Sequence, residues 1–268
     1  MSIVGIIPTR MASSRFPGKP LANINGIPMI GHVYYRSKMA GRLNDVYVAT
    51  CDHEISDYIR GIGGEVIMTS SSHERASDRV AEAMPIIEKK TREKIDIVVL
   101  IQGDEPMVLP EMIELAVQPL MEEEEVTVSN LMANIGSIKE FEDPNEVKVV
   151  VDNEDFALYF SREPIPSLKK HNGTTFPMRK QVCIIPFTRQ CIIDYMNLAP
   201  TPLETIESID MLRFLEHGKK IKMVLTSHQT FAVDTESDLK KVETLMKDDP
   251  LLKKYQNDSS IHSINNVC

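Results

Sequence analysis

The sequence has few cysteines and no long apolar run. The cysteines show neither CxxC spacing nor nearby histidine pairs, so we expect reduced thiols rather than a disulfide framework or a structural zinc site. No stretch approaches the roughly 18 apolar residues that cross a bilayer, and the N-terminal segment lacks the basic region of a signal peptide. We therefore expect a cytoplasmic protein without a membrane anchor. The four cysteines are Cys51, Cys183, Cys191 and Cys268.

Basic residues are also fewer than acidic residues. Lys and Arg number 30 against 39 Asp and Glu, which gives a formal net charge of −9. Because an acidic surface repels the phosphates of DNA and RNA, we expect no nucleic-acid partner. A small anionic ligand can still bind where basic residues are concentrated locally. The 268 residues suffice for one large domain, or for a domain with a sizeable insertion.

Strand and helix patterns alternate through about residue 135. Short apolar runs rich in β-branched residues predict buried strands, and the segments between them have helical spacing. This alternation predicts an α/β fold with a doubly wound sheet. The predicted strands are Ser2–Pro8, Asp45–Thr50, Glu65–Met68 and Ile95–Ile101, and the predicted helices are Pro28–Met39, His53–Gly61 and Ser77–Glu88, the last capped by Ser77.

The pattern changes after residue 135. Val147–Asp152 and Ala157–Phe160 are close together and predict antiparallel strands, and Ser161–Lys180 predicts a loop. The remaining predicted strands are Val182–Pro186, Lys220–Leu225 and Phe231–Val233, and the remaining predicted helices are Leu203–Glu216 and Ser237–Met246.

The loop after the first strand concentrates positive charge. Arg10, Arg15 and Lys19 lie within ten residues, and Ser13 and Gly18 lie between them. Cations and backbone N–H groups at such a turn can bind a polyphosphate. In open α/β sheets ligands bind at the carboxyl ends of the strands, where this loop should lie. The segment is not a Walker A motif, and a solvated basic loop is the alternative.

Two aspartates also follow apolar strands. Asp104 follows the run IDIVVLI in the segment Gln102-Gly103-Asp104-Glu105, and Asp234 follows Ala232-Val233. Two carboxylates beside a triphosphate could hold Mg²⁺, which prefers one or two carboxylates together with substrate phosphates. Taken singly, each aspartate is more often a turn former or a helix cap. Their common position at strand ends favours a metal site.

These motifs resemble those of the 3-deoxy-manno-octulosonate (Kdo) cytidylyltransferase family, also called the CMP-Kdo synthetase family. The matching segments follow the family's order and cover nearly the whole chain. The first of them is specific in combination with IQGDEP. They read IIPTRMASSRFPGKPLANINGIPMIGHVY, VATCD, SDRVAEA, IQGDEP, DPNEVKVVVD, ALYFSREPIP, TPLETIESIDMLRFLEHGKKIK and VDTESDL.

The resemblance implies a nucleotide-diphospho-sugar transferase fold and a single domain over residues 1–268. Residues 1–134 would bind mainly the nucleotide. Residues 135–225 would form the acceptor-binding part and the interface of a homodimer, and residues 226–268 would return to the main sheet. It also implies a reaction, in which an oxygen of a small acidic acceptor attacks the α-phosphate of CTP, with Mg²⁺ on the phosphates, and pyrophosphate leaves.

The resemblance further implies roles for individual residues. Lys19, Arg10 and Asp104 fall on catalytic positions, and Asp104 and Asp234 fall on the metal positions. Nucleotide-binding positions are Pro8, Thr9, Arg10, Ser13, Lys19, Ser77, Arg79 and Gln102. Acceptor-binding positions are Arg162, Gln181, Glu204 and Glu207, of which the two glutamates could equally be solvent-facing helix residues.

The chain departs from the family pattern in two places. The family's Ser-Gly-Thr before the middle helix is Arg75-Ala76-Ser77 here, which bears on the contact with the base. The family's His-Ile-Gly-Ile-Tyr is replaced by the run from Gln181 to Ile185. Because a site built to bond substrate hydroxyls discriminates strongly through them, we hypothesise an acceptor other than ordinary Kdo, such as a modified sugar acid or a phosphonate.

Two further alternatives remain open at this point. A non-catalytic nucleotide-binding module could keep the fold without the chemistry, although Lys19, Asp104 and Asp234 speak against it. A glycosyltransferase that consumes a sugar nucleotide would usually carry an Asp-x-Asp motif, which Gly103-Asp104-Glu105 fits poorly.

Overall fold

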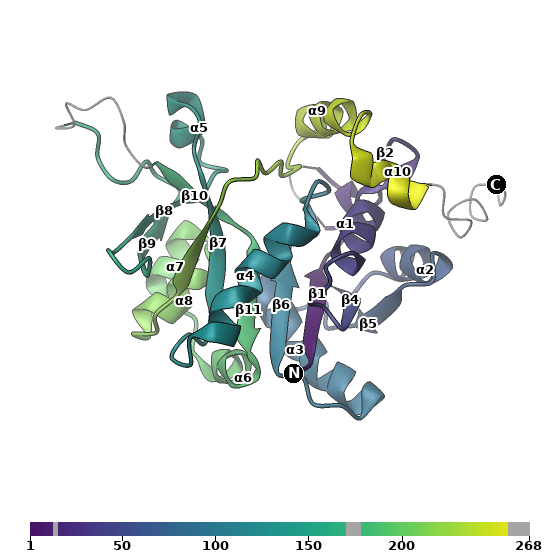
Figure 1. Ribbon diagram of the computed structural model, residues 1–268, viewed down its shortest axis with the longest axis horizontal. Coiled ribbons are helices and arrows are strands. Elements are labelled where there is room, and N and C mark those ends of the chain that lie inside the picture. Colours follow the sequence, from purple (N-terminus) through teal and green to yellow (C-terminus); the bar gives the residue numbers. More distant parts are fainter. Residues whose placement is uncertain (13–15, 170–177, 257–268) are drawn as a thin grey trace. The chain divides into compact units, whose positions relative to one another are not determined.

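The structure is a computed structural model that describes residues 1–12, 16–169 and 178–256 (Figure 1). The chain divides into two compact units, the first formed by Met1–Glu114 with Thr230–Cys268 and the second by Leu115–Gln229. The functional division into 1–134, 135–225 and 226–268 stays a prediction. No helix in the described residues combines the length and apolarity needed to cross a membrane.

A parallel sheet with the order β6-β1-β4-β5 forms the centre of the first unit. Every residue of β1 and β6 is buried, as expected for apolar strands that helices cover on both faces. The strands are β1 (Ile3–Pro8), β4 (Asp45–Thr50), β5 (Glu65–Met68) and β6 (Ile97–Ile101).

The helices between these strands make the sheet doubly wound. Helices α1 and α2 connect strands that progress from β1 to β5, whereas α3 leads back to β6 on the other side of β1 and contacts all four strands. Since parallel crossovers are right-handed, α3 covers the face opposite α1 and α2. The α/β prediction is confirmed. The helices are α1 (Met29–Lys38), α2 (His53–Gly61), α3 (Ala76–Thr91), α9 (Glu236–Met246) and α10 (Pro250–Gln256).

Between β1 and α1 lie a short 3-10 helix and a tight hairpin. The 3-10 helix η1 spans Lys19–Leu21, and β2 (Asn23–Ile24) pairs with β3 (Ile27–Pro28). The turn residues Asn25 and Gly26 have φ values of 49° and 92°. Positive φ at both positions is the geometry that an Asn-Gly pair favours in a two-residue hairpin.

The second unit contains a mixed sheet with the order β12-β7-β10-β8-β9. β7 pairs in parallel with β12, and the pairs β7/β10, β10/β8 and β8/β9 are antiparallel. The antiparallel pairing of β8 with β9 confirms the prediction for this region. The strands of this sheet are β7 (Ser129–Asn134), β8 (Lys148–Val151), β9 (Ala157–Ser161), β10 (Arg179–Val182) and β12 (Lys222–Thr226), and β11 (Ile184–Thr188) is a further strand of the second unit.

An aromatic stack lies in the core of the second unit. Phe187 stacks on Phe214 with ring centroids 5.7 Å apart, and Tyr195 stacks on Phe214 at 5.1 Å. All three side chains are buried, so the stack ties α6 and α8 to β11. The remaining helices are α4 (Pro110–Glu122), which crosses the division between the units, α5 (Ile138–Glu142), α6 (Arg189–Asn197), α7 (Pro202–Glu207) and α8 (Met211–Glu216).

Several predicted elements were wrong in detail. Ser77 does not cap α3, because the helix starts at Ala76 with Arg75 as its N-cap and Ser77 lies buried in the first turn. Leu203–Glu216 is two helices, since Ser208 takes a left-handed φ of 56° and ends α7. Phe231–Val233 forms no strand, and Val182–Pro186 covers the end of one strand and the start of the next.

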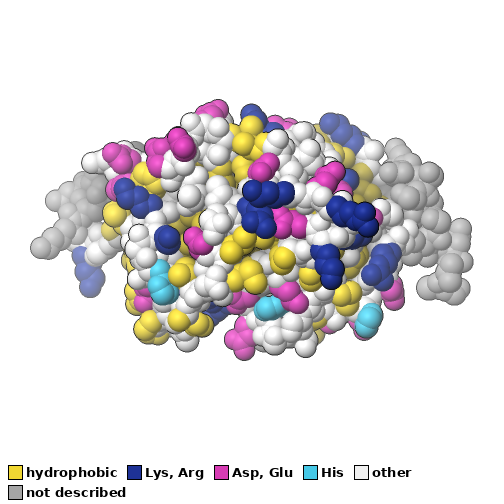
Figure 2. Space-filling view, turned by 90° about the horizontal axis from the view of Figure 1, so that it is seen from below, with side chains coloured by type: hydrophobic (Ala, Val, Ile, Leu, Met, Phe, Trp, Pro, Cys, Tyr) yellow, Lys and Arg dark blue, Asp and Glu magenta, His cyan; other side chains and the backbone are white. Residues whose placement is uncertain are grey.

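Charged side chains are mixed on the face of the molecule drawn in Figure 2. Basic groups lie among acidic and hydrophobic ones over the part of that face that is described.

Candidate active site

The strand order reverses between β1 and β6, and the candidate site lies where these two strands end. The chain crosses from β1 toward β5 and then returns to β6, so the loops after β1 and β6 diverge at a topological switch point. The C-terminal ends of β1 and β6 lie close together at Gly103. A Cβ on Gly103 would meet the carbonyl oxygen of Pro8 at 3.2 Å and the Cβ of Thr9 at 3.3 Å. Glycine at this position lets β6 deliver the following residue, Asp104, beside the loop after β1.

The loop after β1 folds back, so that Lys19 lies near the C-terminal end of β1. The backbone N–H of Met11 donates to the Asp52 carboxylate at 2.7 Å, and the Gly18 N–H donates to the Met11 carbonyl at 3.1 Å. Gly18 has a φ of 75°, a left-handed conformation that costs glycine little, and it starts the 3-10 helix at Lys19. The predicted loop therefore closes on itself, although Ser13 and Arg15 lie outside the described residues.

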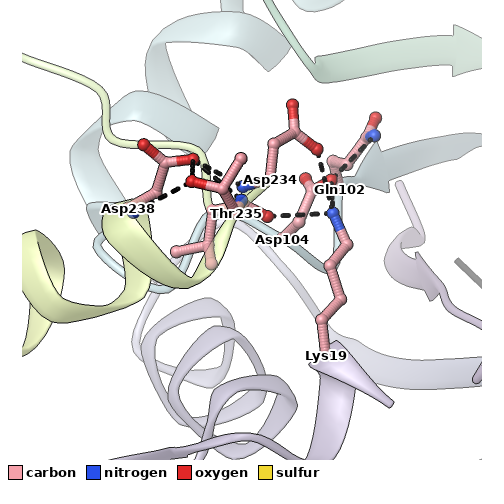
Figure 3. A network of polar contacts seen from close by, with 7 residues as sticks. Lys19, Gln102, Asp104, Asp234, Thr235 and Asp238 are labelled. Carbon is pink, nitrogen blue, oxygen red and sulfur yellow. Dashed lines mark hydrogen bonds and ion pairs between the residues drawn. The ribbon is translucent and has the colours of Figure 1, made fainter. Parts of the chain in front are cut away.

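The Lys19 ammonium joins the two aspartates singled out from the sequence (Figure 3). Its Nζ donates to Asp104 Oδ2 at 2.9 Å, to Asp234 Oδ1 at 3.2 Å and to the Val233 carbonyl at 2.9 Å. The three side chains are 13%, 16% and 21% exposed, so the cluster is largely but not fully shielded from water. Gln102 lies beside it, with Nε2 at 3.5 Å from Asp104 Oδ2.

Backbone contacts hold the second aspartate in place. The N–H of Val233 donates to the Asp104 carbonyl at 2.9 Å, which ties the late segment to the end of β6. Asp238 Oδ2 then accepts from the N–H groups of Asp234 and Thr235 at 3.2 and 2.9 Å, and Thr235 forms a capping box with Asp238 at the start of α9. The end of β6, the segment that ends at Val233 and the start of α9 thus fix the positions of both carboxylates.

The cluster keeps Lys19 charged. Burial tends to lower the pKa of Lys19, but the charges of Asp104 and Asp234 and their hydrogen bonds outweigh burial and raise the pKa above its ordinary value of 10.5. A charged ammonium therefore lies between two carboxylates at the end of β6.

Arg10 and Arg79 converge on one backbone carbonyl. Arg10 Nη1 and Arg79 Nη2 each donate to the His73 carbonyl at 3.4 Å. Arg79, 3% exposed, also donates to Thr69 Oγ1 at 2.5 Å. The His73 ring in turn contacts Glu82 Oε2 at 2.5 Å. The structure thus brings together two of the predicted nucleotide-binding residues at the loop before α3.

The predicted acceptor residues Arg162 and Glu207 lie together in the second unit. Arg162 Nε donates to the Glu207 carbonyl at 2.7 Å, and its Nη2 donates to the Ser208 carbonyl at 3.3 Å, so the guanidinium covers the C-terminal end of α7. The Glu207 carboxylate accepts from Ser161 Oγ at 2.7 Å and from the Arg162 N–H at 2.8 Å. Burial tends to raise the pKa of Glu207, but these hydrogen bonds and a third from Tyr159 hold it below its ordinary value.

Glu204 lies apart from that pair in a buried ion pair. It is 1% exposed, and its carboxylate oxygens accept from Arg213 Nε and Nη2 at 2.8 and 2.6 Å. Arg213 also lies over the Tyr195 ring, 4.4 Å from its centroid. The ion pair joins α7 to α8, and the burial of Glu204 contradicts the solvent-facing position considered for it, while its acceptor contact stays a prediction.

Gln181 is held by a neighbouring strand. Its Nε2 donates to Asn130 Oδ1 at 2.6 Å, and the buried Asn130 donates to the Val182 carbonyl at 2.6 Å. Ile185, at the end of the same departure from the family pattern, is 4% exposed and belongs to the core.

Two residues that support the candidate site had not been predicted. Asp52 orders the start of the loop through the Met11 N–H, and Asp238 orders Asp234. The signal for Asp238 was present in the sequence, because Thr235-Glu236-Ser237-Asp238 has capping-box spacing. No local signal links Asp52 to Met11.

A doubly wound sheet with a lysine and two carboxylates at its switch point is typical of α/β enzymes that bind nucleotides. The Cytidylyltransferase family profile matches residues 4–221. The chain is 43% identical over 251 residues, 90% of this chain and 96% of the relative, to the 3-deoxy-manno-octulosonate cytidylyltransferase of Geobacter metallireducens. It is 41% identical over 256 residues, 92% of this chain and 100% of the relative, to the protein with the same name in Geobacter sulfurreducens.

A solved structure agrees with these relatives. The structure of CMP:2-keto-3-deoxy-manno-octonic acid synthetase complexed with CTP superposes with a TM-score of 0.83 at 37% identity, covering 92% of this chain and 98% of the other. The chain belongs to the cytidylyltransferase family. The predicted family resemblance and the prediction of a nucleotidyltransferase are confirmed.

Proposed function

We propose that this protein transfers CMP from CTP to a 3-deoxy sugar acid of the octulosonate type and releases pyrophosphate. The observation that carries the proposal is the meeting of Lys19, Asp104 and Asp234 at the switch point of the sheet. Its relatives named as 3-deoxy-manno-octulosonate cytidylyltransferases support both the donor and the class of acceptor.

The reaction is a displacement at phosphorus. A hydroxyl oxygen of the acceptor forms a bond to the α-phosphorus of CTP, the bond from that phosphorus to the oxygen bridging to the β-phosphate breaks, and the hydroxyl proton passes to water. Because negative charge accumulates on the departing pyrophosphate, the protein's contribution is to position the reactants and to stabilise this charge. Lys19 and Arg10 are the cations proposed to contact the phosphates.

The donor set at the end of β6 suits Mg²⁺. Asp104 and Asp234 already direct one oxygen each toward a common cation, the Lys19 ammonium. Over the described ranges no group of three or more His, Cys, Asp or Glu side chains is arranged as a metal site. The protein would thus supply two carboxylates, and phosphate oxygens and water would complete the coordination, as Mg²⁺ prefers. Mg²⁺ bound there would neutralise charge on the phosphate oxygens.

The acceptor is proposed to bind near Arg162 in the second unit. The Arg162 guanidinium is held by α7 carbonyls and by the Pro144 carbonyl at 3.0 Å, so its orientation is fixed before a ligand arrives. A fixed guanidinium suits a carboxylate ligand, because little side-chain freedom remains to be lost on binding. Glu207 fixes the backbone of the same residue through its N–H.

A second candidate concerns the acceptor's identity. Within the run from Gln181 to Ile185, which departs from the family pattern, Gln181 Nε2 donates to Asn130 Oδ1 and the Ile185 side chain is buried. Fewer side-chain groups are then available to bond sugar hydroxyls, which favours an acceptor other than ordinary Kdo, such as a modified sugar acid or a phosphonate.

A panel assay tests both candidates. Purified protein is given CTP, Mg²⁺ and one acid at a time, namely Kdo, other 3-deoxy ulosonic acids or small phosphonates, and pyrophosphate release is measured. Turnover with octulosonates supports the main proposal, and a preference for Kdo above all others contradicts the second candidate. If the second candidate holds, a Gln181→His, Ile185→Tyr double variant should gain activity with Kdo.

The negative outcomes also differ from one another. Turnover with phosphonates alone would retain the cytidylyltransferase and reject the sugar acid. CTP binding without pyrophosphate release across the panel would favour a non-catalytic nucleotide-binding module. We also propose that the protein acts in the cytoplasm as a homodimer, for which light scattering on the purified protein is the direct test of the assembly.

A further inference from the structure

The Lys19 ammonium has all of its hydrogen-bonding capacity in use. An ammonium group has three N–H donors, and Lys19 Nζ contacts Asp104 Oδ2, Asp234 Oδ1 and the Val233 carbonyl at 2.9, 3.2 and 2.9 Å. In this state Lys19 is turned toward the carboxylates (Figure 3). It therefore fills the position where the two carboxylates converge.

The two carboxylates do not depend on Lys19 for their placement. Asp104 follows β6 directly, and its carbonyl accepts from the Val233 N–H at 2.9 Å. The backbone of Asp234 is held by Asp238, which also caps α9. When Lys19 moves away, the aspartates should stay together, and their unneutralised charges would then attract another cation.

The proposed function requires Lys19, Asp104 and Asp234 to be arranged differently. Lys19 would contact a triphosphate, and Asp104 and Asp234 would hold a divalent cation. One ammonium with three donors cannot fill the carboxylate site and bind phosphates with the same hydrogens. The two arrangements are therefore alternatives, and passing from one to the other is an exchange of partners.

Resting on the proposed function, we propose that Lys19 is an internal stand-in for the divalent cation. In the nucleotide-free protein it occupies the carboxylate site and competes with free metal ions. A triphosphate draws the ammonium to its own oxygens, which are strong acceptors for a charged donor, and so opens the site. Nucleotide and metal would then favour each other's binding, and the carboxylates would never face each other without a cation.

The competition can be measured without any turnover. Mn²⁺ serves as the probe, and its affinity for the nucleotide-free protein is measured by electron paramagnetic resonance. Lys19→Met keeps a chain of similar length but removes the charge, so free Mn²⁺ should bind about tenfold more tightly or better, the size expected from losing charge-assisted hydrogen bonds to the carboxylates. In a Lys19→Met, Asp104→Asn double variant this gain should disappear.

The second measurement is CTP affinity in EDTA by calorimetry. Lys19→Met should weaken metal-free CTP binding while it strengthens Mn²⁺ binding. Opposite movement of the two affinities is the signature of the stand-in role, because a variant that is merely misfolded would weaken both. Lys38→Met is the matched control, since it removes a lysine from an exposed pair with Asp45 at 3.0 Å and should change neither affinity.

Unchanged or weaker Mn²⁺ binding in Lys19→Met overturns the proposal. This outcome is distinct from failure of the proposed function. If the wild-type protein turns over CTP with a sugar acid while Lys19→Met leaves Mn²⁺ affinity unchanged, the enzyme assignment stands and the stand-in role is wrong. If no acid supports turnover but the two affinities move in opposite directions, the cation exchange stands and the reaction is wrong.

Discussion

Acidification should destabilise the protein through one buried histidine. His32 on α1 is fully buried, and its Nε2 lies 2.8 Å from the Ile24 carbonyl, so this nitrogen must carry the hydrogen. Its Nδ1 lies 2.8 Å from the Tyr255 hydroxyl, which therefore donates to it. The same hydroxyl accepts from Arg36 Nε at 3.1 Å. Protonation of His32 would reverse one hydrogen bond and add a positive charge beside Arg36.

The size of the effect follows from the pKa of His32. Burial, aided by the nearby Arg36 charge and partly offset by the bond to the Ile24 carbonyl, lowers the pKa from 6.5 to about 4. Between these values the unfolded chain binds a proton that the folded protein does not, so the free energy of unfolding falls as pH falls from 6.5 toward 4. From pH 7.5 to pH 5 the loss is about 2 kcal/mol, equivalent to roughly 4–8 °C in Tm.

The assay is thermal unfolding followed by circular dichroism between pH 7.5 and pH 5. His32→Gln cannot titrate, so its Tm should change much less over this range, whatever its absolute stability. His53→Gln, which alters an exposed histidine at the first residue of α2, should keep the wild-type pH dependence. Equal pH dependence in wild type and His32→Gln would refute the reasoning. The hydrogen-bonded Glu207 contributes at lower pH, because its lowered pKa makes its stabilisation fade only below about 4.5.

Three further substitutions test other parts of the structure. Asp104→Asn should lower kcat/KM for pyrophosphate release by about 100-fold and leave the circular dichroism spectrum unchanged; a rate near wild type at low Mg²⁺ would reject its metal role. Glu207→Gln should raise the KM for the acceptor about tenfold through lost positioning of Arg162 with little change in the KM for CTP, whereas parallel changes in both would indicate general disorder. Glu204→Gln leaves the buried Arg213 charge without its partner and should lower the free energy of unfolding by about 3 kcal/mol, measured by urea denaturation; a loss below 1 kcal/mol would argue against the buried ion pair.

The meeting of Lys19, Asp104 and Asp234 in the candidate site could be predicted from the sequence because strand ends are visible there. Apolar runs ending at Pro8, Ile101 and Val233 showed where strands or extended segments stop. The rule that ligands bind at the carboxyl ends of parallel strands then placed Lys19 and Asp104 together. The helix boundaries of α2 and α9 were also close to the prediction, because helical periodicity is a local signal.

The remaining features depend on contacts between distant residues. Nothing in the sequence around Glu204 shows that it will form a buried ion pair with Arg213. Asn130, which accepts a hydrogen bond from Gln181, is 51 residues from it in the sequence. The break between α7 and α8 depends on the left-handed backbone of Ser208. Because this residue is not glycine, the sequence does not indicate a helix end there. The Asn25-Gly26 hairpin, by contrast, carried a clear local signal that was overlooked.

The most direct test of the account is pyrophosphate release from CTP and a 3-deoxyoctulosonic acid by wild-type protein and by Asp234→Asn. Asp234 shares the Lys19 cation with Asp104, and its backbone is held by Asp238, so the substitution should leave the fold intact while removing half of the carboxylate pair. We expect acid-dependent release by the wild type and a loss of at least about 100-fold in the variant. Equal rates in the two proteins, or release that does not depend on the acid, would contradict it.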